Sequence, residues 1–129
     1  MSVRPAELLR LRLRCDASAP ALARRAVAEL AVIDPVREDA LLIVSELATN
    51  AVIHSGSRPE DKFEIRADLV PAGLRIAVTD QGRSNTSPVR REGNHPGPGG
   101  MGLRVVEALA RRWGSERDHH LEVWAELAL

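Results

Sequence analysis

The sequence has one cysteine, few aromatic residues, one lysine and no net charge, and each shortage excludes a class of protein. Cys15 alone can form neither an internal disulfide nor a metal site built from several cysteines. The 18 basic and 18 acidic residues cancel, which argues against a general nucleic-acid or anionic-membrane binder, because such proteins rely on a cationic surplus. No apolar run approaches the ~20 residues of a membrane helix, and no signal-peptide pattern opens the chain. We therefore expect a cytoplasmic protein.

The scarcity of aromatic residues and of lysine also bears on the core and on the chemistry. Aromatic residues make up 2% of the chain, namely Phe63, Trp113 and Trp124, so the core must be aliphatic. Lys62 is the only lysine, which removes catalytic lysine chemistry almost entirely. A chain of 129 residues buries roughly 65–70% of its unfolded surface on folding. Since no repeat or linker divides it, we expect one domain over residues 1–129.

The spacing of apolar residues predicts the order of the elements. Alternating leucines and arginines predict a first strand, and helical spacing then predicts two helices. Asp34 is the expected N-cap of the second helix, with Pro35 at its first position and an end near His54. The predicted elements are a strand over 9–14, helices over 21–33 and 34–54, a hairpin over 62–69 and 74–79, a loop without regular structure over 82–102, a helix over 103–112 and a strand pair over 113–117 and 123–127.

Several predicted strands have one apolar and one charged face. This pattern is typical of an antiparallel or mixed sheet that has helices on one side and solvent on the other. A doubly wound parallel sheet is excluded, because its strands would be apolar on both faces. The expected fold class is therefore α+β, a two-layer α/β sandwich with a mixed, mostly antiparallel sheet.

Glu46 and Asn50 are the first candidates for chemistry, because they lie four residues apart on the second predicted helix. At this spacing the two side chains share one face, and His54 continues the stripe one turn later. A carboxylate can act as a general base, and an amide oxygen can ligate a hard cation such as Mg²⁺. The alternative is that this stripe is the solvent face of an amphipathic helix.

Two glycine-containing segments are the other candidates. Asp80 and Gly82 follow an apolar strand, where the carboxylate can accept a hydrogen bond from an exocyclic amine and the glycine lets a flat ligand approach the backbone. The alternative there is an ordinary turn. The run from Gly97 to Gly102 leads into the helix over 103–112, whose first amides can face a phosphate. The alternative there is a flexible loop, since the spacing matches neither a P-loop nor a Rossmann fingerprint.

Taken together and in this order, the three segments resemble the histidine-kinase-like ATPase superfamily with the Bergerat ATP-binding fold. Glu46–Ala51 is similar to the N box of that superfamily, Asp80–Gly82 to the first glycine box, and Gly100–Leu103 to the second. The resemblance covers about residues 9–128. Within the superfamily the chain is most similar to the small anti-sigma-factor serine kinases of bacteria, both in length and in the residues of its N box. Sensor histidine kinases usually carry a basic residue where Ile53 stands here.

The resemblance implies ATP and Mg²⁺ as cofactors and gives each site residue a role. Asp80 would accept a hydrogen bond from the adenine amino group, Gly82 would allow close approach of the base, and Asn50 would hold Mg²⁺. Glu46 would be the general base that takes the proton of a serine hydroxyl on a protein substrate. The residues expected at the phosphates are Gly100, Met101, Gly102 and Leu103, with lesser contributions from His54 and Arg104, under an ATP lid formed by residues 83–99.

One part of the chain departs from the family pattern. The final strand often carries a threonine that helps to hold the adenine aspartate, and no threonine lies between His119 and Val123 here. We expect Glu122 to lie near Asp80, where it would raise the pKa of that carboxyl or weaken adenine binding. His119 and His120 are expected to be turn residues, because no third metal ligand is evident.

The resemblance therefore implies an ATP-dependent serine kinase that regulates transcription by phosphorylating an anti-sigma-factor antagonist. It also allows a sigma factor as a further partner and a homodimer that forms through the sheets. One alternative is a module that holds a partner protein, with or without nucleotide, and transfers no phosphate. A plain ATPase of the gyrase class is the third reading, disfavoured because no transducer domain is present.

Overall fold

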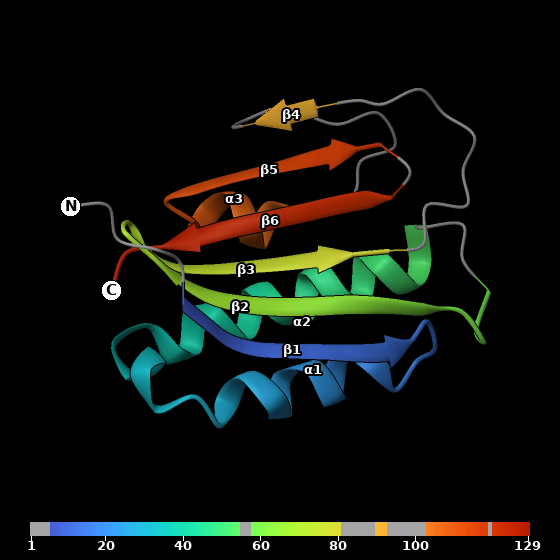
Figure 1. Cartoon of the computed structure of the whole chain (residues 1–129), viewed down its shortest axis with the longest axis horizontal. Coiled ribbons are helices and arrows are strands. Elements are labelled where there is room, and N and C mark those ends of the chain that lie inside the picture. Colours follow the sequence, from blue (N-terminus) through green and yellow to red (C-terminus); the bar gives the residue numbers. More distant parts are fainter. Residues whose placement is uncertain (1–5, 55–57, 81–89, 93–102, 119) are drawn as a thin grey trace.

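The computed structural model describes residues 6–54, 58–80, 90–92, 103–118 and 120–129. They form two layers, a sheet and a set of helices that covers one face of it (Figure 1). The predicted α+β sandwich is thus confirmed. The elements are β1 (Ala6–Arg14), α1 (Ala19–Ala28), the 3₁₀ helix η1 (Ala31–Val36), α2 (Arg37–His54), β2 (Lys62–Val70), β3 (Gly73–Thr79), β4 (Arg90–Glu92), α3 (Arg104–Leu109), β5 (Arg112–Arg117) and β6 (Leu121–Leu127).

The sheet has six strands in the order β1-β2-β3-β6-β5-β4. Each pair of neighbouring strands is antiparallel, so the described strands contain none of the parallel pairings that a mixed sheet would have. The predicted β2–β3 hairpin is present, with Val70 paired to Gly73 across a tight turn. Gly73 has a φ of 139°, and a Cβ there would overlap the backbone of Leu127, so both conformation and space require glycine.

The junction of the first two helices differs from the prediction. Helix α1 ends at Ala28, and Asp34 and Pro35 lie inside η1 rather than at the start of α2. The Asp34 carboxylate accepts hydrogen bonds from the Arg37 guanidinium, which also donates to the Ala28 and Leu30 carbonyl oxygens. Asp34 is thus held by a side chain in place of the helix amides that it was expected to cap.

The prediction was also wrong about one strand and one helix end near the expected loop. The three residues Arg90–Glu92 form strand β4, which pairs with β5 inside a segment expected to hold no regular element. This strand forms because its backbone pairs with β5, a segment more than twenty residues later, and the local composition does not indicate such a partner. Helix α3 ends at Leu109, not at Arg112, because the Arg111 amide donates to the Glu126 carbonyl oxygen and the chain enters the sheet there.

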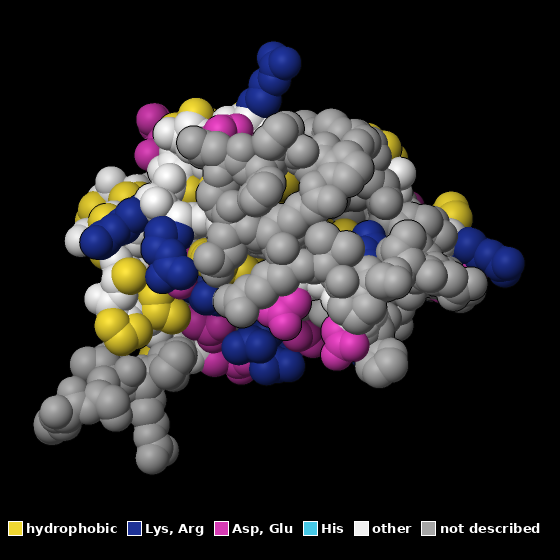
Figure 2. All heavy atoms as spheres, turned by 90° about the horizontal axis from the view of Figure 1, so that it is seen from above, with side chains coloured by type: hydrophobic (Ala, Val, Ile, Leu, Met, Phe, Trp, Pro, Cys, Tyr) yellow, Lys and Arg dark blue, Asp and Glu magenta, His cyan; other side chains and the backbone are white. Residues whose placement is uncertain are grey.

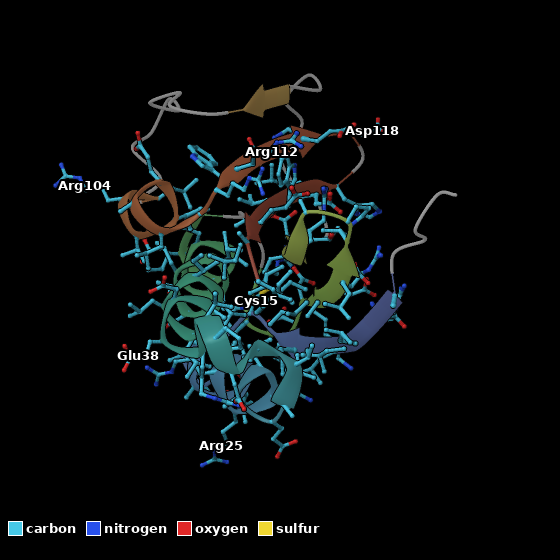
Figure 3. All side chains as sticks on the ribbon, turned by 90° about the vertical axis from the view of Figure 1, so that its left-hand side faces the viewer. Cys15, Arg25, Glu38, Arg104, Arg112 and Asp118 are labelled. Carbon is cyan, nitrogen blue, oxygen red and sulfur yellow. The ribbon has the colours of Figure 1, made fainter. Side chains whose placement is uncertain are left out.

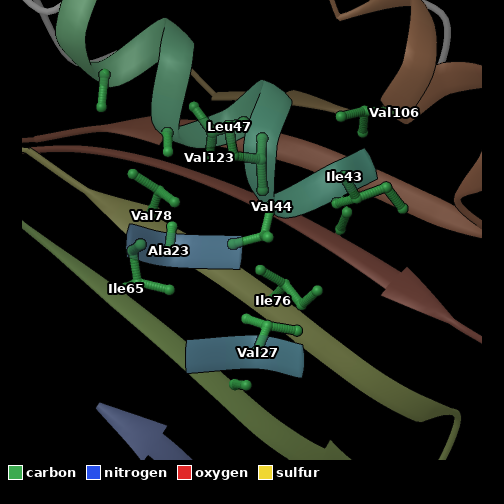
Figure 4. Close-up of a cluster of buried hydrophobic side chains, with 14 of the residues drawn as sticks. Ala23, Val27, Ile43, Val44, Leu47, Ile65, Ile76, Val78, Val106 and Val123 are labelled. Atoms are coloured by element: carbon green, nitrogen blue, oxygen red, sulfur yellow. The ribbon is translucent and has the colours of Figure 1, made fainter. Parts of the chain in front are cut away.

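The core lies between the sheet and the helices and is aliphatic, as predicted (Figure 4). Phe63 and Trp113 are the aromatic residues that take part in it. No helix in the described part of the chain combines the length and apolar character that crossing a bilayer requires. Among the core side chains labelled in Figure 4 are Ala23 and Val27 from α1, Ile43, Val44 and Leu47 from α2, Ile65, Ile76, Val78 and Val123 from the sheet, and Val106 from α3.

The other face of the sheet has no helix over it and carries interleaved charges. In Figure 2, which looks down on the β4 edge, basic and acidic side chains alternate along the lower margin, where this open face lies. Trp124 lies on this face yet is buried, because the guanidinium groups of Arg75 and Arg112 lie 4.3 and 5.5 Å from its ring centroid. Arg75 also donates a 3.1 Å hydrogen bond to the buried Glu126. The side chains of Arg75, Arg112, Trp124 and Glu126 on the open face thus contact one another.

Candidate functional site

Asn50 and Asp80 line one cavity, although thirty residues separate them in the sequence. Asn50 comes from α2 and Asp80 follows the end of β3, so two of the three predicted segments meet. The cavity has a free volume of about 10 Å³, room for about one water molecule. Its remaining wall is aliphatic and is formed by Leu47, Ala51, Val78, Leu121 and Val123.

The Asp80 carboxylate is held by the first residue of β6. Its Oδ1 accepts a 3.3 Å hydrogen bond from the Leu121 amide, and the Asp80 amide donates to the Leu121 carbonyl oxygen over 3.0 Å. Val78 and Val123 are a cross-strand pair in the core, so the next inward positions along these two strands are Asp80 and Leu121. The carboxylate is therefore buried on the helix side of the sheet and fixed in orientation.

The structure corrects the expectation for Glu122. Glu122 pairs with Thr79 on the open face, the opposite side of the sheet from Asp80. Its Oε2 accepts a 3.4 Å hydrogen bond from the Thr79 hydroxyl, and its Oε1 lies 3.7 Å from Nη2 of Arg75. Glu122 therefore makes these contacts on the open face, away from the side on which the Asp80 carboxylate is buried. The task expected of a threonine hydroxyl is met here by the backbone amide of Leu121.

Asn50 presents an unused donor inside the protein. Its side chain is 6% exposed, and Nδ2 has no hydrogen-bond partner among the described residues. A buried amide without an acceptor costs stability, so a ligand oxygen or ring nitrogen placed there would recover free energy. Together with the Asp80 acceptor, the cavity offers one donor and one carboxylate within aliphatic walls, which fits a purine nucleotide in chemistry. Its volume is smaller than a purine, so entry of a base requires the lining side chains to move.

Glu46 lies one turn before Asn50 on α2 and is not part of the cavity wall. Within the described residues its carboxylate makes no hydrogen bond or ion pair. Partial burial raises the pKa of Glu46 above its ordinary value of 4.5, because removal from water disfavours the charged form. A carboxylate with a raised pKa and no fixed partner is suited to accept a proton.

Of the other predicted site residues, the structure describes the side chains of Leu103 and Arg104, and neither lines this cavity. Leu103 packs against the core at the start of α3, and Arg104 is exposed and points away from the ribbon (Figure 3). His54 ends α2, and its side chain lies outside the described residues. Also outside them are Gly82, Gly100, Met101, Gly102, His119 and the lid residues 83–89 and 93–99.

The sequence motifs include Leu47 and Ala51 in the N box without a role of their own, and they leave Val78, Leu121 and Val123 outside any predicted site. Their positions contained the signal, because Leu47 and Ala51 flank Asn50 on the helix and Val78 shares a strand face with Asp80. Any residue packed beside a buried polar pair on the same face is a wall candidate.

A second hollow, of about 350 Å³, opens beside Thr79 and is lined by Glu116, Asp118, His120 and Glu122. Its acidic lining would repel phosphate. The described residues contain no cluster of side chains arranged to hold a metal ion. His120 lies in the turn between β5 and β6, as expected, where its carbonyl oxygen accepts a hydrogen bond from the Asp118 amide.

The sequence over residues 7–125 matches the family described as the histidine kinase-like ATPase domain. Because the match covers most of the chain, the protein belongs to this family, and the resemblance seen in the three boxes is confirmed at that level. A comparison with curated proteins finds no match. Membership implies ATP binding, and the family typically binds ATP together with Mg²⁺.

Proposed function

We propose that the chain is an ATP-dependent protein serine kinase that phosphorylates an anti-sigma-factor antagonist and thereby regulates transcription. The observation that carries the proposal is the meeting of Asn50 and Asp80 in one cavity, with Glu46 one helical turn away. A nucleotide site alone would serve a plain ATPase. Glu46, whose carboxylate has no partner in the described part of the chain and whose pKa is raised, adds the group that a protein kinase needs to accept a hydroxyl proton.

Each described residue has a task in this proposal. Asp80, oriented by the Leu121 amide, accepts a hydrogen bond from the exocyclic amine of adenine. Asn50 offers its amide oxygen to Mg²⁺ and its unpartnered Nδ2 to a ligand acceptor. ATP supplies the γ-phosphoryl group, and Mg²⁺ neutralises the charge on the phosphates. Glu46 takes the proton from the serine hydroxyl while the serine oxygen bonds to the γ-phosphorus, the bond from that phosphorus to the β–γ bridging oxygen breaks, and ADP leaves.

The glycine boxes complete the proposal at the level of sequence. Gly82 would let the base approach the backbone beyond Asp80. Gly100, Met101, Gly102 and Leu103 would bind the phosphates, with His54 and Arg104 as further contacts.

The experiment is phosphotransfer from γ-labelled ATP to purified candidate antagonists, with wild type and Glu46→Ala compared. We expect Glu46→Ala to transfer phosphate roughly 10²- to 10⁴-fold more slowly while its ATP affinity changes less than about twofold. Glu60→Ala, which removes an exposed glutamate in the turn before β2, is the control and should behave as wild type. A Glu46→Ala variant of full activity would remove the assigned role.

A second function is favoured by one observation, the small volume of the cavity. A chain whose purine site stays closed would hold a partner, such as an antagonist or a sigma factor, without transferring phosphate. The open, charged face of the sheet is a surface on which a homodimer could form. The same assay separates the two functions, because a pure binding module would capture its partner and leave it unlabelled.

A further inference from the structure

The two most exposed large hydrophobic side chains of the described residues both lie on α2. Leu42 is 54% exposed and Ile53 is 64% exposed. They are eleven residues apart, which is about three turns at 3.6 residues per turn, so they share one stripe of the helix. Single exposed apolar residues are normal on a protein surface. Two aligned on one helix face call for a reason.

Glu46 lies on the same stripe, between the two apolar residues. It follows Leu42 by four residues and precedes Ile53 by seven, spacings of about one and two turns. At a rise of 1.5 Å per residue, the stripe from Leu42 to Ile53 is about 16 Å long. The carboxylate with the raised pKa therefore sits within an exposed apolar strip.

The charge at the start of this strip is negative. Glu38 lies one turn before Leu42, beside Asp39, and Figure 3 shows Glu38 directed away from the helix layer. Arg37, the cation at this end of α2, is occupied by Asp34 and by the carbonyl oxygens of the preceding helix end. Acidic residues in a first turn also suit the helix dipole, which explains Glu38 and Asp39 but neither Leu42 nor Ile53.

We infer that the stripe of Leu42, Glu46 and Ile53 is the docking surface for the protein substrate, and this inference rests on the proposed function. A general base must come within hydrogen-bond reach of the hydroxyl that it deprotonates. The substrate surface around that hydroxyl must then cover the helix on both sides of Glu46. The matching substrate presents an apolar patch around its acceptor serine, with an arginine or lysine at the border that faces Glu38.

The test measures phosphotransfer to the antagonist that the wild-type chain labels in the assay above. Leu42→Ser and Ile53→Ser should each raise the KM for the antagonist roughly tenfold, since each loses the burial of a large side chain on docking. The affinity for ATP and the kcat at saturating antagonist should stay within about twofold. Leu22→Ser is the matched control, because Leu22 is a 40% exposed leucine on the neighbouring helix α1 and lies off the stripe.

A charge reversal tests the basic border of the substrate. Glu38→Lys should raise the same KM at low salt, and the difference from wild type should shrink at high salt because screening weakens charge pairing across an exposed border.

The outcomes separate this inference from the proposed function. If the wild type labels an antagonist and neither serine variant changes its KM, the docking surface is wrong and the kinase stands. If Leu22→Ser has the same effect as the two stripe variants, the effect is not specific and the inference is also overturned. If the wild type labels no antagonist, the proposed function fails, and the docking surface fails with it.

Discussion

Asp80 and Leu121 exchange two hydrogen bonds. The Leu121 amide donates to Asp80 Oδ1 over 3.3 Å, and the Asp80 amide donates to the Leu121 carbonyl oxygen over 3.0 Å. The acceptor proposed for adenine is thereby fixed to the backbone of the last strand. A backbone donor does not depend on which side chain stands at position 121. The Asp80 carboxylate is therefore held in orientation although the last strand has no threonine at this place.

Removing this donor should weaken nucleotide binding. Leu121 is the first residue of β6, a position at which proline can start a strand. We expect Leu121→Pro to bind ADP roughly tenfold more weakly than Leu121→Ala, because a hydrogen bond to a charged group contributes about 1.5–3 kcal/mol. The comparison by isothermal titration isolates the amide, since both variants lose the leucine side chain. Equal affinities would mean that the Leu121 amide does not position Asp80.

The raised pKa of Glu46 predicts how stability depends on pH. The folded state holds this proton more tightly than the unfolded state, so the ionised carboxylate costs stability once the pH rises through the folded pKa. Glu46→Gln should therefore be more stable than wild type near pH 7. The gain should shrink as the pH falls toward 4.5, the ordinary pKa, and vanish well below it, where the glutamate is protonated in both states. Urea unfolding at several pH values measures this, and a gain that is independent of pH would contradict it.

The contacts of Arg75 on the open face should contribute to the stability of the fold and have no effect on nucleotide affinity. Arg75→Met leaves Glu126 buried, with Arg112 Nη1 at 3.8 Å as the nearest remaining cation among the described side chains, and uncovers one side of Trp124. We expect a loss of about 2 kcal/mol, below that of a fully buried pair because Arg75 is partly exposed. Urea unfolding measures it, and Arg10→Met, which breaks the exposed pairs of Arg10 with Glu7 and Glu64, should cost less than about 1 kcal/mol. ADP affinity should not change in either variant, because the cavity lies on the other face.

Most of the fold could be predicted because apolar and charged residues alternate along its strands and so indicate which face of each strand is buried. The leucine and arginine alternation of β1 and the apolar spacing of α2 are local patterns, and both elements end where those patterns predict, although β1 begins at Ala6 and α2 at Arg37. The start of α2 could not be located, since it depends on Arg37 reaching back to carbonyl oxygens nine and seven residues earlier. Strand β4 depends in the same way on a distant partner, strand β5.

The polar residues of the candidate site could be predicted from the sequence, whereas the residues that surround them could not. The motifs identified Asn50 and Asp80, whose meeting then depends on how α2 packs on the sheet. The error over Glu122 was avoidable, because Val123, Ala125 and Leu127 form the inward face of the last strand and so place Glu122 outward. The Leu121 amide could not be foreseen, since any residue other than proline supplies the same donor.

The central claim is that Asp80 and Asn50 form an adenine-nucleotide site, and a thermal shift with ADP and Mg²⁺ tests it most directly. At about one hundred times its dissociation constant a ligand adds about 2.7 kcal/mol, so the Tm of the wild type should rise by about 5 °C or more. Asp80→Asn should show no rise. Asp68→Asn, which alters a buried carboxylate paired with Arg66 on the open face, should keep the full rise even if its starting Tm is lower. A wild type that ADP does not stabilise, or an Asp80→Asn variant stabilised as much as the wild type, would contradict the account.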